Sequence, residues 1–295
     1  AQKIVSNLTR EYNLDGLTYN SSASIGVTLF NSENLSKEDL LKQADMAMYK
    51  AKYAGRNGVQ FFDPQMQVAV SSRAAIISDL YSAIQSQQFV LFYQKQVNHL
   101  KQCIGVEVLL RWIHPEKGMV SPLQFIPLAE ETGLIVPIGE WVLEEACATL
   151  AKWSLESEKQ HLSIAVNISV VQFSKDNFVQ TVLNALKTSG ANPQLLKLEI
   201  TETLLANNIP DVKAKMKELQ QHGVTFSIDD FGTGYSSLSY LKQLPINQLK
   251  IDQGFVRDII NSSNDRAIAQ AVITLANSME LQVIAEGVET EAQRA

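Results

Sequence analysis

Two adjacent carboxylates, Asp229 and Asp230, stand between an apolar run and a Gly-rich turn. The run Val224–Ile228 predicts a buried strand, and the glycines of Phe231–Gly234 suit a tight turn. Neighbouring carboxylates repel each other, so at a buried strand end they reduce stability unless a cation neutralises them. This stretch alone leaves two interpretations open: an exposed acidic turn, or a site for a divalent cation.

Further polar residues stand on the other expected strands, in each case near the strand's carboxyl end. Together with the pair above, this set comprises Glu107, Asn167, Glu199, Asp229, Asp230, Lys250 and Glu286. Each residue also has a simpler interpretation. Glu107 could be an acid with a partner near a strand edge, Asn167 could cap the following helix, and Glu199 could form an ion pair with Lys197 or Lys250. Lys250 could be a solvated charge, and Glu286 could be an acid in the first turn of a helix. The shared position on the strands favours a common site.

The elements that must position these residues begin at Phe89. Seven strand candidates alternate with helical patterns, and most are continuously apolar, which is typical of parallel strands covered by helices. These candidates are Phe89–Val97, Cys103–Trp112, Leu162–Ile168, Leu195–Ile200, Val224–Ile228, Gln248–Ile251 and Leu281–Ala285. The series predicts an α/β fold, a TIM-like (β/α)8 barrel whose last strand and helix are missing. A doubly wound open sheet is the alternative, but its ligand normally binds at one crevice, and no GxGxxG or GxxxxGK[ST] motif occurs.

In a closed barrel the carboxyl ends of the strands converge on one face, so these side chains would share one pocket. Carboxylate and amide oxygens favour Mg²⁺ or Mn²⁺ over zinc, which prefers histidine or cysteine. Enzymes that hydrolyse phosphodiesters commonly use two such cations. Lys250 would then orient or help deprotonate the attacking water, or neutralise a phosphate oxygen.

Residues 1–63 predict an α+β fragment with a strand in Ser24–Phe30, a helix after Ser36 and a strand in Val59–Phe62. This is too little structure for a core of its own, so we expect the end of a domain whose first part is absent. A linker helix is expected at residues 64–77, and residues 78–295 form the barrel domain.

Composition limits the classes of function. Among the 295 residues, 25 basic and 31 acidic side chains give a net charge of −6, which argues against binding to a nucleic acid polymer. No apolar run approaches the roughly 20 residues of a membrane span, so no membrane segment is expected. Cys103 and Cys147 lack metal-ligand spacing and indicate a reducing compartment. We expect a cytoplasmic location, with any membrane anchor of the parent protein lying in upstream segments.

The second domain resembles the EAL family of cyclic di-GMP phosphodiesterases over residues 78–295. The matching stretches are YQKQV, EVLLRW, AVNIS, LEITET, DDFGTGYSSLSYL, LKID and AEGVET. Residues 1–63 resemble the C-terminal part of a GGDEF, or diguanylate cyclase, domain through SIGVTLF, ADMAMYKAK and GRNGVQFF. The signature loop that names the GGDEF domain is not in this sequence, so the sequence does not address cyclase activity.

The resemblance implies metal-dependent hydrolysis of cyclic di-GMP to linear pGpG in bacterial second-messenger signalling, with Mg²⁺ or Mn²⁺ in a two-metal site. It implies that Glu107, Asn167, Glu199 and Asp229 hold one metal, and that Asp229 and Asp230 hold the second. The other implied roles are catalysis by Lys250 and Glu286 together with Glu107, stabilisation of the loop after Asp230 by Glu202, and dinucleotide binding by Gln94, Leu109 and Arg111. It also implies a homodimer through residues 232–240.

The sequence departs from the family pattern in three places. Val108 replaces the alanine of the naming tripeptide, and Lys95 stands where proline is frequent. The chain also stops at Ala295, before the strand and helix that would close the barrel, so we expect lower stability and activity than in the parent. A non-catalytic cyclic di-GMP receptor is the alternative function. Receptors of this kind are expected to lose metal ligands, and the set is complete here, which favours the hydrolase.

Overall fold

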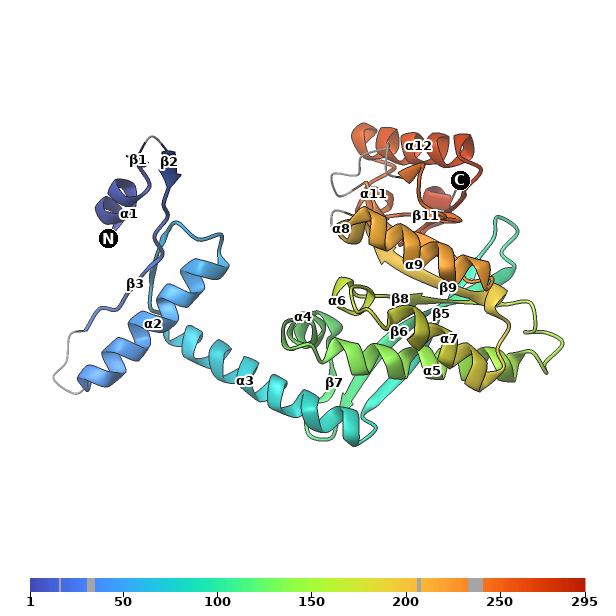
Figure 1. Cartoon of the computed structure of the whole chain (residues 1–295), viewed down its shortest axis with the longest axis horizontal. Helices are drawn as coiled ribbons and strands as arrows, with labels where there is room; N and C mark the ends of the chain where they lie inside the picture. Colours follow the sequence, from blue (N-terminus) through green and yellow to red (C-terminus); the bar gives the residue numbers. More distant parts are fainter. Residues whose placement is uncertain (16, 31–34, 206–207, 233–240, 295) are drawn as a thin grey trace. The chain divides into compact units, whose positions relative to one another are not determined.

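The computed structural model of the chain describes residues 1–15, 17–30, 35–205, 208–232 and 241–294 (Figure 1). Contacts between residues divide the chain into two compact units, Ala1–Asp79 and Leu80–Ala295, and each is described by itself. The division falls within helix α3 (Pro64–Gln85). The domain boundary expected between residues 77 and 78 remains a prediction.

The first unit packs one long helix against two short parallel strands. Ser36 starts helix α2 because its side chain accepts a hydrogen bond from the Asp39 amide, as predicted for a helix beginning there. Strand β3 pairs with β4, and a Cβ at Gly26 of β3 would overlap the carbonyl oxygen of Ala44 in α2, so only glycine allows this close approach. The elements are α1 (Gln2–Leu8), β1 (Glu11–Leu14), β2 (Leu17–Asn20), β3 (Ile25–Val27), α2 (Lys37–Tyr53) and β4 (Val59–Phe61).

The second unit is built on a curled sheet with the strand order β12-β11-β10-β9-β8-β6-β5, and β7 pairs with β6. Strands β6 and β8 to β12 are parallel to one another, which confirms the expected barrel-type α/β fold. The strands are β5 (Phe89–Val97), β6 (Cys103–His114), β7 (Gly118–Val120), β8 (Ser163–Asn167), β9 (Leu196–Thr201), β10 (Thr225–Phe231), β11 (Gln248–Ile251) and β12 (Gln282–Ala285).

Strand β5 is antiparallel to β6, so the expectation of a parallel series is wrong for this strand. The physical reason is the short connection: only residues 98–102 separate β5 from β6, whereas a parallel pair needs a crossover of a dozen or more residues. The direction of β5 matters for the site. Its amino-terminal half pairs with the carboxyl-terminal half of β6, and Val90 lies opposite Arg111.

Helices cover the convex side of the sheet (Figure 1). Their bounds are α4 (Pro122–Thr132), α5 (Ile135–Trp153), α6 (Val170–Phe173), α7 (Phe178–Ser189), η1 (Pro193–Leu195), α8 (Glu202–Leu205), α9 (Ile209–Gln221), α11 (Gln253–Arg257), α12 (Ser263–Ser278) and α13 (Glu291–Arg294). The helix expected at Ser236–Gln243 lies mostly outside the described residues. None of the described helices combines the length and apolar character needed to cross a membrane.

The two faces of the sheet differ in polarity, as β9 illustrates. Leu196, Leu198 and Ile200 are fully buried in the apolar core, whereas Lys197 and Glu199 alternate with them and contact polar residues of β11 instead. The concave side of the sheet therefore collects charged and amide side chains, and this is the side on which the predicted site residues gather.

Candidate metal centre and active site

The ammonium group of Lys250 lies at the centre of the candidate site. Its Nζ atom is 3.2 Å from Glu107 Oε2, 2.8 Å from Glu199 Oε2 and 3.0 Å from Asp229 Oδ1, and the Glu286 carboxylate is a fourth contact. The lysine side chain is only 1% exposed, so its interpretation as a solvated charge is wrong. Glu199 pairs with Lys250, which was one of its two expected partners. Five residues from five strands or strand ends thus meet at one point.

Burial and charge oppose each other in this cluster. Burial raises the pKa of Glu199 to about 7 and that of Glu286 to about 7, although Lys250 lowers both. Burial alone would lower the pKa of Lys250, but the surrounding carboxylates, Glu199 first among them, raise it above the ordinary lysine value. One ammonium group cannot neutralise four carboxylates, so the site keeps an excess of negative charge that suits cations.

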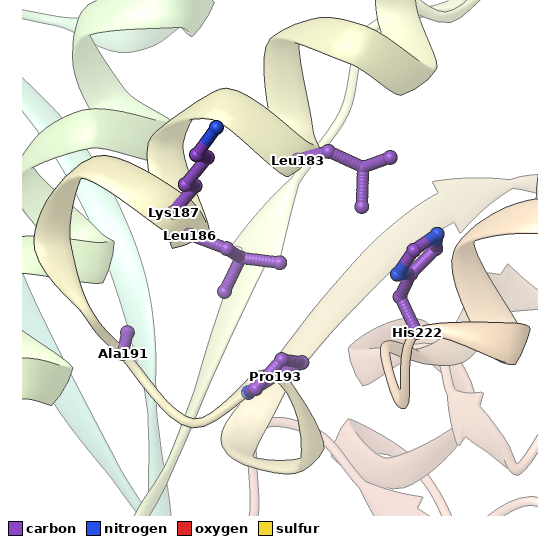
Figure 2. A pocket seen from close by; sticks show the side chains of 6 residues that line it. All are labelled: Leu183, Leu186, Lys187, Ala191, Pro193 and His222. Atoms are coloured by element: carbon purple, nitrogen blue, oxygen red, sulfur yellow. The ribbon is translucent and has the colours of Figure 1, made fainter.

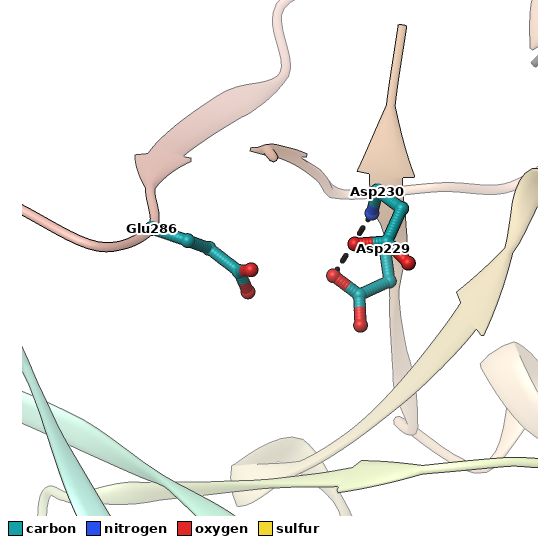
Figure 3. Close-up of side chains that lie close together, drawn as sticks. All are labelled: Asp229, Asp230 and Glu286. Atoms are coloured by element: carbon teal, nitrogen blue, oxygen red, sulfur yellow. Dashed lines mark hydrogen bonds between the residues drawn. The ribbon is translucent and has the colours of Figure 1, made fainter. Parts of the chain in front are cut away.

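A bulge in β10 brings two consecutive carboxylates to the same site. In a regular strand Asp229 and Asp230 would point to opposite faces. The β10–β11 register instead shifts between Ile228 and Phe231, and Asp230 adopts a left-handed conformation with φ of 52°. Carboxylate oxygens of Asp229, Asp230 and Glu286 consequently lie within 4.8 Å of one another, and Asp229 Oδ1 accepts a hydrogen bond from the Asp230 amide (Figure 3). This acidic group is suited to hold a metal ion.

Asn167 and Glu202 occupy the edges of the cluster. Asn167 Nδ2 donates a 2.8 Å hydrogen bond to Glu107 Oε1, which leaves the amide oxygen for another partner. The cap of the following helix α6 is Ser169, so the interpretation of Asn167 as a cap is wrong. Glu202 Oε1 accepts a 3.3 Å hydrogen bond from the backbone amide of Gly232, the residue that immediately precedes residues 233–240. Those residues, on which the dimer prediction falls, lie outside the described part of the chain.

The predicted dinucleotide-binding residues share one face of the β5–β6 hairpin with Glu107. Gln94 lies opposite Glu107, and Leu109 and Arg111 follow Glu107 at alternate positions along β6. Arg111 Nη1 donates a 2.9 Å hydrogen bond to the Leu110 carbonyl, and the guanidinium carbon lies 5.5 Å from the centre of the Phe92 ring. The hairpin therefore extends the site from the acidic cluster towards the carboxyl end of β6.

Two further charged residues lie near the cluster: Asp252, which the predicted set of site residues did not include, and Lys197, which was expected only as a partner of Glu199. Asp252 caps α11 by accepting from the Gly254 amide at 2.8 Å. Burial, Asp229 and Asp252 together raise the pKa of Asp230 to about 6, so Asp252 lies close to the cluster. Its position two residues after Lys250 was the available signal. Lys197 alternates with Glu199 along β9 and donates a 2.9 Å hydrogen bond to Gln248 Oε1.

A separate cavity of about 370 Å³ lies at the amino ends of β9 and β10, whereas the acidic cluster lies at their carboxyl ends (Figure 2). Among the described residues no carboxylate lines this cavity, and we assign it no part in the chemistry of the cluster. Its walls are formed by Leu183, Leu186, Lys187, Ala191, Pro193 and His222.

Parallel strands covered by helices, with acidic residues converging at the carboxyl ends, define a class: α/β barrel proteins with an oxygen-rich site for divalent cations. A family model described as "EAL domain" matches residues 77–295, and one described as "Diguanylate cyclase, GGDEF domain" matches residues 1–58. The chain therefore belongs to the EAL domain family, and part of a GGDEF domain precedes its EAL domain.

Curated proteins of similar sequence are named as cyclic di-GMP phosphodiesterases. The chain is 43% identical over 295 residues to "Bifunctional diguanylate cyclase/cyclic di-GMP phosphodiesterase MucR" of Pseudomonas aeruginosa, covering 100% of this chain and 43% of that protein. It is 38% identical to "Cyclic di-GMP phosphodiesterase NbdA" of the same species, covering 100% of this chain and 38% of the relative. The chain thus spans well under half the length of these curated relatives.

A solved structure of one of these relatives is also similar. The structure "PaMucR Phosphodiesterase, c-di-GMP complex" has a TM-score of 0.72 and 47% sequence identity, covering 75% of this chain and 89% of that chain.

Proposed function

We propose that the EAL domain of this chain hydrolyses cyclic di-GMP to linear pGpG in bacterial second-messenger signalling. The observation that carries the proposal is the contact of Lys250 with four carboxylates, which are carried by β6, β9, β10 and the residue after β12. The names of the similar phosphodiesterases and the cyclic di-GMP complex of a relative support the choice of substrate.

Two divalent cations, Mg²⁺ or Mn²⁺, are the proposed cofactors. The side chains fit them, because every candidate ligand atom is an oxygen, and Glu199 Oε1 is buried without a hydrogen-bond partner among the described residues. When bound, such cations activate water and stabilise negative charge on the attacking and leaving oxygens. The proposed ligands are Glu107, Asn167, Glu199 and Asp229 for one cation, and Asp229 and Asp230 for the other.

The remaining roles belong to the protein's own groups. Glu286 is suited to accept a proton from water near neutral pH, because burial raises the pKa of its carboxylate to about 7. Lys250 orients the four carboxylates and supplies positive charge for a phosphate oxygen. Gln94, Leu109 and Arg111 are proposed to bind the dinucleotide. Glu202 is proposed to stabilise the loop after Asp230 through its contact with Gly232.

Three proposals rest on the family resemblance and the composition rather than on contacts in the site. They are a homodimer through residues 232–240, a cytoplasmic location and domain boundaries at residues 63/64 and 77/78. The oligomeric state is open to measurement by light scattering.

Incubation of the protein with cyclic di-GMP and Mg²⁺ or Mn²⁺ tests the proposed activity, with chromatography to detect pGpG. We expect pGpG with the unmodified chain and a loss of roughly 100-fold or more in kcat for Glu107→Gln, since one ligand of the cluster is then neutral. Glu158→Gln is the matched control, because Glu158 is exposed on a loop outside the cluster.

The same experiment separates the hydrolase from the alternative, a cyclic di-GMP receptor. Tight binding of cyclic di-GMP without any pGpG, in the presence of either cation, would contradict hydrolysis and favour the receptor. The receptor has no specific observation in its favour, because each proposed metal ligand is present.

A further inference from the structure

We propose that Phe92 is a positioning residue that holds the Arg111 guanidinium in the orientation needed to bind cyclic di-GMP. This inference rests on the proposed function and adds a residue to it. Phe92 is a large aromatic side chain, yet it is 46% exposed. It lies on the same face of β5 as Gln94 and directly opposite Leu109 of β6, so its ring borders the surface proposed to receive the dinucleotide.

The direction of β5 explains why an aromatic residue lies at this end of the hairpin. Because β5 is antiparallel to β6, Phe92 in the middle of β5 is next to the part of β6 that follows Glu107. Phe89 and Leu91 alternate with Phe92, and Phe89 packs on the helix side of the sheet, with its ring 6.1 Å from that of Trp112. The exposed position of Phe92 is therefore a consequence of the strand's alternation and not of disordered packing.

Two contacts hold the Arg111 guanidinium in its position. The guanidinium carbon lies 5.5 Å from the centre of the Phe92 ring, which is the range of a cation–π interaction. Nη1 donates to the Leu110 carbonyl at 2.9 Å. In the part of the chain that the structure describes, Arg111 forms no ion pair, so its charge is available to an anionic ligand.

An arginine that is already held loses less conformational freedom when a ligand binds it. The ring of Phe92 lies beside the guanidinium group and the Leu110 carbonyl accepts one of its N–H groups, so other N–H groups remain for acceptor atoms of the dinucleotide. Such an arrangement strengthens binding of the substrate and leaves the chemistry at the acidic cluster unchanged. Loss of the Phe92 ring should consequently change the affinity and not kcat.

A double-mutant cycle tests the coupling between the two residues. We expect Phe92→Leu to raise the KM for cyclic di-GMP by about two- to fivefold, as for an exposed cation–π pair, with kcat within twofold of the unmodified protein. Phe92→Tyr should restore the KM, because it keeps the aromatic ring. In an Arg111→Ala background, Phe92→Leu should have no further effect. Additive losses in the double variant, or a fall in kcat alone, would overturn the proposal.

A second measurement needs no ligand. In the free protein, the ¹⁵N–¹H resonance of Arg111 Nε should carry a ring-current shift that Phe92→Leu removes and Phe92→Tyr keeps. An unchanged resonance in Phe92→Leu would refute the positioning role even if that variant binds weakly. Tyr49→Leu is the matched control, since Tyr49 is an exposed ring in the first unit with Lys52 Nζ 5.3 Å from its centre.

The two proposals fail in different ways. If the unmodified protein neither binds nor cleaves cyclic di-GMP, the proposed function is wrong and the role of Phe92 in it is withdrawn. If the unmodified protein is active but the cycle shows additive effects, only the role of Phe92 is wrong.

Discussion

At the scale of single residues, Lys250 acts as a cation that the protein carries on its own chain. Its contacts with Glu107, Glu199, Asp229 and Glu286 keep four carboxylates together that would otherwise repel one another. The two aspartates of the β10 bulge are not equivalent. Asp229 contacts Lys250. The pKa of the Asp230 carboxylate is instead raised, first by burial and then by the negative charges of Asp229 and Asp252.

Replacement of the two aspartates should therefore have different effects on cation binding. If Asp229 is a shared ligand, Asp229→Ala should abolish binding of both Mn²⁺ ions, while Asp230→Ala should leave one. Equilibrium dialysis or calorimetric titration gives the stoichiometry. Asp176→Ala, at an exposed position outside the cluster, should leave it unchanged. Equal stoichiometry in the Asp229 and Asp230 variants would contradict the shared ligand.

The acidic cluster also predicts how stability depends on pH. The pKa of Glu199 and that of Glu286 rise from 4.5 to about 7 on folding, so between these values the folded state binds more protons than the unfolded state. The free energy of unfolding of the metal-free protein should accordingly fall as pH rises from 4.5 to about 7. Urea denaturation in a chelator at several pH values measures this slope, and Glu199→Gln should reduce it. A rise in stability over this range would contradict the expected protonation.

At the scale of elements, the bulge in β10 decides what the Asp229-Asp230 sequence can do. Alternation along a regular strand would direct one carboxylate into the site and the other away from it. The left-handed conformation of Asp230 costs conformational energy, and it is maintained where both carboxylates are directed towards one group of acids.

This backbone conformation predicts an unusual order of stability among variants. With φ of 52° at position 230, Asp230→Gly should unfold with a free energy about 1 kcal/mol higher than Asp230→Ala, because glycine adopts this region without steric cost. Chemical denaturation of the metal-free proteins measures the difference. The same pair at Asp176, which is not among the described residues with positive φ, should not favour glycine. Equal stability of the two Asp230 variants would argue against a strained bulge.

Apolar runs and helix signals located most strands and helices of the two units correctly, since burial against helices demands continuous or alternating apolar residues. The helix cap at Ser36 and the strand Phe89–Val97 are examples. The direction of β5 depends on the length of the connection after Val97, which periodicity does not report. The two-strand hairpin formed by β1 and β2 was not predicted.

Part of the candidate site could be predicted from the sequence. The carboxyl ends of the strands identified the acids that meet Lys250, because parallel strands bring those ends together. The position of Asp252 and the aromatic contact of Arg111 depend on side-chain packing between elements, and a single sequence does not encode that packing as a pattern.

At the scale of the whole molecule, the chain consists of two compact units, Ala1–Asp79 and Leu80–Ala295, and the proposed cation ligands all belong to the second. Binding to the folded state raises the stability of the unit that binds. The effects of cations and of mutations in the first unit should consequently be separable.

Differential scanning calorimetry tests this separation. Addition of Mg²⁺ should raise the unfolding temperature of the transition that belongs to the second unit and leave the other unchanged. Gly26→Ala should lower only the transition of the first unit, because the added Cβ would overlap the Ala44 carbonyl oxygen. Gly58→Ala is the matched control in the same unit, since an added Cβ there would lie 3.6 Å from the Arg56 carbonyl oxygen, which is an ordinary contact. A shift of both transitions by Mg²⁺ would contradict independent units.

The antiparallel direction of β5 has a consequence for control of the enzyme by the preceding chain. Helix α3 ends at Gln85, and only residues 86–88 separate it from β5, which begins with Phe89 at the end of the hairpin that carries Arg111. The Gln88 side chain accepts from Trp112 Nε1 at 3.0 Å, and its carbonyl accepts from the Ile113 amide at 2.9 Å. The covalent path from α3 thus enters the domain beside the proposed dinucleotide-binding residues of the hairpin, so a change in the direction of this helix would act directly on the strand that faces Arg111.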